Sequence, residues 1–101
     1  MSVLMTLRVK ADPAKFEEYA AQNKEKMQAI ANRGREHGAI HHAFYGSDDG
    51  TLLVIDEWDS PESFQAFFDA SPDIGEVMQG SGASSEPEVT FWRKLEGHDE
   101  F

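Results

Sequence analysis

The sequence contains no cysteine among its 101 residues. Disulfide bonds, thiolate nucleophiles and zinc–thiolate sites are therefore excluded. No apolar run approaches the roughly 20 residues that a membrane-spanning helix needs, and the amino terminus lacks the basic and apolar regions of a signal peptide. We therefore expect a soluble, cytoplasmic protein that does not engage a membrane.

Positive charge is also scarce. The chain carries 19 acidic and 9 basic side chains, a formal net charge of −10, and its basic residues form no continuous stripe. Long-range repulsion disfavours polyanionic partners, so we expect no binding to nucleic acid or to an anionic membrane. The sequence also lacks a Gly-rich phosphate loop and a nucleophile elbow. We therefore predict no flavin, nicotinamide or other cofactor.

The sequence periodicities follow the order strand, long helix, two strands, short helix, strand. Asp12 and Ser60 suit helix N-caps, and the proline after each suits the first helical position. This βαββαβ order predicts a ferredoxin-like α+β fold with a four-stranded antiparallel sheet. We expect one domain over residues 1–95 and a flexible tail over 96–101. The expected strands span 3–9, 40–45, 52–58 and 89–93, one continuous helix runs from Asp12 to about 35–37, a second helix begins at Ser60, and a short one spans 73–79.

The pair Asp49-Gly50 between the two central strands predicts a β-hairpin. The chain turns either tightly on these two residues or through a four-residue loop, and both registers assign the side chains to the same faces of the sheet. One face is expected to carry His41, Ala43, Tyr45, Leu52, Val54, Asp56 and Trp58, and the other Ile40, His42, Phe44, Leu53, Ile55 and Glu57.

Both faces of this sheet carry apolar residues, whereas the helices can cover only one. A second subunit is the simplest cover for the other face. We therefore predict a homodimer in which two sheets pack face to face.

The segment from Asp56 to Phe67, with the sequence DEWDSPESFQAF, resembles the antibiotic biosynthesis monooxygenase-like family. It has an acidic residue, an aromatic residue and a capped helix where that family has its third strand and second helix. The resemblance covers roughly Val3 to Leu95 and implies a dimeric α/β barrel of two ferredoxin-like subunits. It implies cofactor-independent oxygenation of aromatic polyketides, haem degradation or isomerisation.

The sequence departs from the family pattern in two respects, a lack of the family's histidines and a lack of an asparagine on the first strand. Many members have a histidine where Phe67 stands and another near Asp73. The haem-degrading branch has an asparagine on the first strand, and residues 3–9 contain none. The resemblance therefore does not imply haem degradation.

His41 is the first candidate for a catalytic residue, because imidazole can move a proton near neutral pH. On the expected hairpin face Asp56 lies close enough to orient its ring. The alternative is a half-buried histidine bonded to a carboxylate for packing alone. His41 and His42 cannot bind one metal ion from a regular strand, because successive side chains face opposite sides. No metal site is predicted.

Four further residues are candidates for binding a flat aromatic ligand: Asn23, Tyr45, Trp58 and Phe67. For the aromatic residues the alternative is the core or a dimer interface. Asn23 lies within the apolar stripe of the first helix, so its amide should be paired. It is expected to bond either to the backbone or Tyr45, or to a ligand oxygen.

These residues favour a cofactor-independent monooxygenase acting on a phenolic or polycyclic aromatic substrate. His41 and Asp56 would handle protons, while Asn23, Tyr45 and Trp58 position the ring. One alternative is a non-catalytic or stress-related binding protein of the same fold. Another is an isomerase with His41 as its base.

Overall fold

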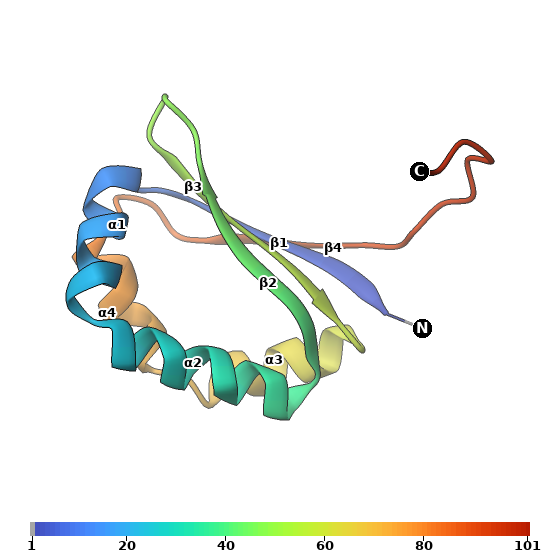
Figure 1. Ribbon diagram of the computed structural model, residues 1–101, viewed down its shortest axis with the longest axis horizontal. Helices are drawn as coiled ribbons and strands as arrows, with labels where there is room; N and C mark the ends of the chain where they lie inside the picture. The colour runs from blue at the N-terminus through green and yellow to red at the C-terminus, as the bar shows by residue number, and fades with distance from the viewer. Residues whose placement is uncertain (1) are drawn as a thin grey trace.

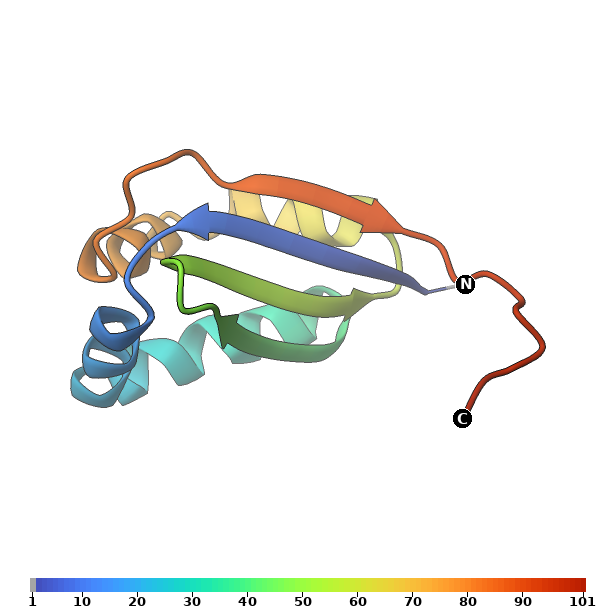
Figure 2. The ribbon, with the colours of Figure 1, turned by 90° about the horizontal axis from the view of Figure 1, so that it is seen from above.

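The computed structural model describes residues 2–101, which form one four-stranded antiparallel sheet and four helices. The strands lie in the order β2-β3-β1-β4, and the helices lie against one face of the sheet (Figure 1, Figure 2). The predicted ferredoxin-like fold is confirmed. The elements are β1 (Val3–Lys10), α1 (Pro13–Gln22), α2 (Lys24–His37), β2 (Ala39–Gly46), β3 (Thr51–Trp58), α3 (Pro61–Asp69), α4 (Asp73–Gly80) and β4 (Glu88–Trp92).

Two of the helices begin where the sequence predicts. Asp12 accepts a hydrogen bond from the backbone N–H of Ala14 at 2.9 Å, and Ser60 accepts one from the N–H of Ser63 at 3.2 Å. Each cap satisfies a backbone donor that the helix itself leaves free. The sequence therefore specifies how the chain enters α1 and α3.

The prediction of one continuous first helix, with Asn23 buried on its apolar stripe, is wrong. The helix breaks at Asn23, where φ is −132° and ψ is 42°. Its Nδ2 donates to the carbonyl oxygen of Tyr19 at 2.9 Å, and the side chain is half-buried. Asparagine favours such breaks because its side chain competes for backbone groups. The break allows α1 to contact α4, while α2 contacts α3 and β2.

The turn between β2 and β3 sets a register that differs from both expected registers. Ser47 N donates to the carbonyl oxygen of Thr51 at 3.0 Å, and Gly50 N donates to that of Ser47 at 3.3 Å. The loop therefore has three residues, 48–50, and Gly50 has the left-handed φ of 86° that such a loop requires.

This odd-numbered loop reverses the predicted faces of β2. His42 lies opposite Asp56, and His41 lies opposite Glu57. The expected faces of β2 are wrong because both expected loops had an even number of residues, and a shift of one residue moves every side chain to the other face. At the start of β2, Ala39 pairs with Trp58, so Ile40 is the extra residue of a β-bulge.

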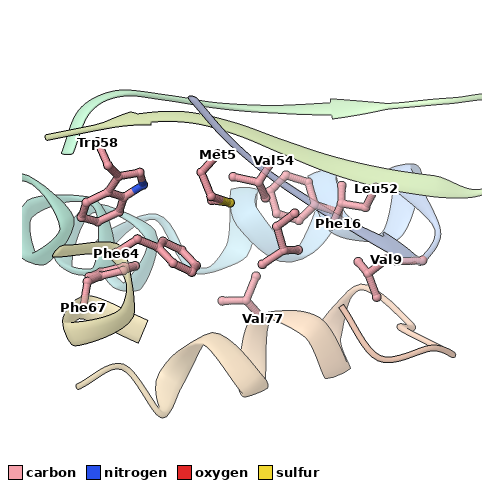
Figure 3. Close-up of a cluster of buried hydrophobic side chains, with 11 residues drawn as sticks. Met5, Val9, Phe16, Leu52, Val54, Trp58, Phe64, Phe67 and Val77 are labelled. Carbon is pink, nitrogen blue, oxygen red and sulfur yellow. The ribbon is translucent and has the colours of Figure 1, made fainter. Parts of the chain in front are cut away.

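The hydrophobic core lies between the sheet and the helices, as Figure 3 shows. Trp58 is only 1% exposed, and its ring centroid lies 5.5 Å from that of Phe64 and 5.3 Å from that of Phe67. These three aromatic side chains gather at one end of the core, and Phe16, Leu52 and Val9 lie towards the other (Figure 3). Aromatic clusters of this kind bury a large apolar area.

Two charged contacts attach α4 to α2. Arg33 donates to both carboxylate oxygens of Asp73, at 2.8 and 3.1 Å, and to Ser71 Oγ at 3.0 Å. Lys26 Nζ lies 2.8 Å from Glu76 Oε2. The hydrogen bonds from Arg33 lower the pKa of Asp73 below its ordinary value. This carboxylate therefore contributes stability above the pKa it has in the unfolded chain, and the contribution is lost as the pH falls through its folded pKa.

The other face of the sheet has no helix over it within residues 2–101 (Figure 2). Large apolar side chains are exposed there: Leu4 by 43%, Tyr45 by 56% and Trp92 by 51%.

After β4, residues 93–101 form no helix or strand and lead away from the sheet (Figure 1). The mobility expected for 96–101 stays a prediction. No helix within residues 2–101 is long and apolar enough to cross a membrane.

Candidate functional site

A cavity of about 280 Å³ lies between the helix-covered face of the sheet and the helices α2, α3 and α4. Most side chains that line it are apolar, including Met27, Met78 and Phe67. The exposed residues among those lining it are Arg35 at the end of α2 and residues 40–42 of β2. These residues define the mouth of the cavity, which therefore opens between α2 and the bulged end of β2.

A buried carboxylate lies in the cavity wall. Asp56 is 5% exposed, and each of its oxygens has a partner. Oδ1 lies 2.7 Å from Nδ1 of His42, and Oδ2 accepts a hydrogen bond from the indole Nε1 of Trp58 at 3.0 Å. We call these three residues the His42–Asp56–Trp58 array. Two donors offset the cost of removing a carboxylate from water.

The contact with Asp56 indicates which nitrogen of the His42 ring carries the proton. An ionised carboxylate can only accept hydrogen bonds, so Nδ1 carries the proton in the pair with Asp56. In the neutral ring, Nε2 is then the nitrogen with a free lone pair. The side chain of His42 is 40% exposed and lines the cavity, so a ligand can reach it. This arrangement suits general base catalysis.

The ring of His42 is also held by a neighbouring aromatic side chain. It lies edge-on to Phe44, with 4.9 Å between ring centroids, and Phe44 contacts Phe16 at 4.3 Å. Phe44 therefore connects the array to the core near α1. Packing of this kind restricts the orientation of a functional side chain.

The predicted site residues are only partly brought together. Asp56, Trp58 and Phe67 line the cavity, whereas Asn23 and Tyr45 do not. Tyr45 lies opposite Leu53 on the uncovered face of the sheet, because the odd loop turns it away from Asp56. The amide of Asn23 bonds to the backbone of Tyr19 at the helix break, and the backbone was one of its expected partners.

The prediction that His41 lies beside Asp56 is wrong. His41 borders the mouth of the cavity, but its cross-strand neighbour is Glu57. His42 occupies the place expected for His41. The sequence Asp48-Asp49-Gly50 is also compatible with a three-residue loop, in which a type I turn ends in a left-handed glycine, and that loop would have placed His42 beside Asp56.

Within residues 2–101, no three His, Cys, Asp or Glu side chains come together in a way that could hold a metal ion.

No protein-family model matches the sequence, and no curated protein sequence matches it either. Solved structures do match. SnoaB, a cofactor-independent oxygenase from Streptomyces nogalater, has a TM-score of 0.62 and 19% identity, over 98% of this chain and 98% of that one. The monooxygenase ActVA-Orf6 of Streptomyces coelicolor, solved with the ligand nanaomycin D, has a TM-score of 0.63 and 18% identity, over 95% and 89% of the two chains.

A dimeric ferredoxin-like protein from an uncultured marine organism matches with a TM-score of 0.64 and 15% identity, over 99% of this chain and 90% of that one. Structures described as putative antibiotic biosynthesis monooxygenases also share this fold, so the resemblance predicted from the sequence is confirmed in the fold. At identities this low the likeness establishes the shared fold and does not assign an activity.

Replacement of Asp56 by alanine should lower the free energy of unfolding by roughly 1–3 kcal/mol, because it leaves the buried indole N–H of Trp58 without an acceptor. Chemical denaturation followed by tryptophan fluorescence measures this loss. The matched control is Glu17→Ala, which removes an exposed carboxylate from α1 and should change stability little. Equal stability of the two variants would contradict a structural role for the array.

Proposed function

We propose that this protein is a cofactor-independent monooxygenase that oxidises phenolic aromatic compounds of about two fused rings. The observation that carries the proposal is the His42–Asp56–Trp58 array in the wall of an apolar cavity. The fold shared with SnoaB, itself described as a cofactor-independent oxygenase, supports it.

The size of the cavity limits the substrate. A cavity of about 150 Å³ lined by apolar side chains holds one benzene molecule. The cavity here measures about 280 Å³, which suits two fused rings. A larger polycyclic molecule would extend through the mouth into solvent.

Proton removal is the part of the reaction that the array would perform. Nε2 of His42 takes the proton of the phenol, and the resulting phenolate is rich enough in electrons to react with dioxygen. A C–O bond forms at the ring carbon opposite the phenol oxygen, and the O–O bond then breaks. One oxygen atom stays on that carbon and the other leaves as water, together with the hydrogen of that carbon and the phenolic proton. The products are a quinone and water, and the substrate supplies all the electrons.

The apolar walls would keep water away from the phenolate and from the peroxide formed on it. Trp58, Phe64 and Phe67 are buried and line the cavity. Exclusion of water limits side reactions such as loss of the peroxide. The flat faces of these rings suit contacts with an aromatic substrate.

A homodimer completes the proposal. The uncovered face of the sheet exposes Leu4, Tyr45 and Trp92, and a second copy of the same face would cover them. The dimeric state of the ferredoxin-like neighbour from a marine organism is consistent with this arrangement. The cavity lies on the opposite face, so each subunit would keep its own mouth.

Oxygen uptake with 1-naphthol tests the oxygenase proposal. In buffer containing EDTA, the wild-type protein should consume oxygen and form 1,4-naphthoquinone. His42→Gln should reduce the rate about 100-fold or more, since it removes the general base. His98→Gln in the carboxy-terminal segment is the matched control and should retain the wild-type rate.

Two results would contradict this proposal. The first is loss of activity in His41→Gln with full activity in His42→Gln, which would identify His41 as the base. Tight binding of naphthol without oxygen uptake would favour the alternative of a non-catalytic, small-molecule-binding protein.

Light scattering at micromolar concentration should give a mass of about twice the 11.3 kDa of the chain. Trp92→Glu should shift the mass towards the monomer, because it places a charge on the proposed interface. Glu88→Gln, on the same strand, is the control and should leave the dimer intact. A monomer mass for the wild-type protein would contradict the face-to-face arrangement.

A further inference from the structure

Two arginines of α2 have different environments although they are two residues apart. Arg33 is bound to Asp73 through two hydrogen bonds and to Ser71 through a third. Arg35 donates only to the neutral Oδ1 of Asn32, at 3.0 Å, and within residues 2–101 it forms no ion pair. The guanidinium of Arg35 is therefore available to an anion from outside the chain.

Arg35 is also placed where a ligand would pass. It is exposed and lines the mouth of the cavity, beside the bulge at Ile40. A basic residue in the last turn of a helix interacts favourably with the negative end of the helix dipole, and Arg35 makes this interaction too. That role does not require a position at the mouth of a cavity.

The charges around the cavity differ from those of the chain as a whole. The chain has a formal net charge of −10. Within residues 2–101, however, the only carboxylate that lines the cavity is Asp56, whose two oxygens are both engaged within the array. At the mouth, Arg35 is exposed and forms no ion pair with any carboxylate of residues 2–101. An anionic group at the mouth would be attracted by the charge of Arg35.

We infer that the cavity selects aromatic acids, with the rings inside and a carboxylate bound by Arg35 at the mouth. A carboxylate is costly to bury, so it stays at the solvent end, while the rings contact the apolar walls. The guanidinium can hold both carboxylate oxygens at once. This inference rests on the cavity of the proposed function but does not depend on the oxidation step.

Calorimetric titration of the full chain with 2-naphthoate and 2-naphthamide tests the inference. The two probes share their rings and differ in charge. The wild-type protein should bind naphthoate more tightly than naphthamide. Arg35→Gln should weaken naphthoate binding about 10-fold or more, since a hydrogen-bonded charge pair is lost, and should leave naphthamide binding unchanged.

Two further variants make the test specific. Lys24→Gln removes the same charge from the exposed other end of α2 and should not change the affinity for either probe. Arg35→Lys keeps the charge but loses the planar guanidinium that can bind both carboxylate oxygens, and it should give an intermediate affinity for naphthoate. Circular dichroism spectra confirm that each variant is folded.

Equal wild-type affinity for the two probes would overturn the inference, as would equal weakening of naphthoate binding by Arg35→Gln and Lys24→Gln. These results are distinct from a failure of the oxygenase proposal. If naphthoate selectivity depends on Arg35 while naphthol consumes no oxygen, the carboxylate site stands and the oxygenase proposal falls. If naphthol is oxidised while the probes are not discriminated, the oxygenase proposal stands and the carboxylate site falls.

Discussion

The register between β2 and β3 is the constraint on which the candidate site depends. The loop of residues 48–50 sets this register, and Gly50 allows the loop because it adopts φ of 86° at low cost. With one residue more or fewer in the loop, His42 would point to the uncovered face and His41 would lie beside Asp56. The position of one glycine in a surface turn therefore decides which histidine meets the buried carboxylate.

The buried carboxylate links the core to the cavity. Asp56 holds the indole of Trp58 on one oxygen and the ring of His42 on the other. Trp58 belongs to the aromatic cluster with Phe64 and Phe67, so the carboxylate is anchored on the side of the core. His42 remains half-exposed. The arrangement pairs a rigid acceptor with an accessible base, and side chains held in this way need little reorganisation during a reaction.

Much of the fold follows from local patterns in the sequence. The caps at Asp12 and Ser60 specify two helix starts, and alternating apolar residues specify β1 and β3 with their buried faces. The candidate site is harder to predict from the sequence, because an odd or an even number of residues in one loop decides which side chains belong to it. The same dipeptide, Asp49-Gly50, is compatible with loops of two, three or four residues, so the dipeptide alone does not predict the register. The helix break at Asn23, which allows α1 to contact α4, arises from the local hydrogen bond of its side chain, and helical periodicity alone does not reveal it.

The central claim is that Asp56 holds His42 with its proton on Nδ1 and its Nε2 open to the cavity. Long-range proton–nitrogen NMR correlation of the histidine rings measures this directly, at a pH where the ring is neutral. The account predicts that His42 is in the Nδ1–H tautomer in the free protein. It also predicts that a bound phenol shifts Nε2 of His42 and leaves the nitrogens of His98 unchanged. An Nε2–H tautomer in the free protein, or a phenol that leaves His42 unaffected, would contradict the account.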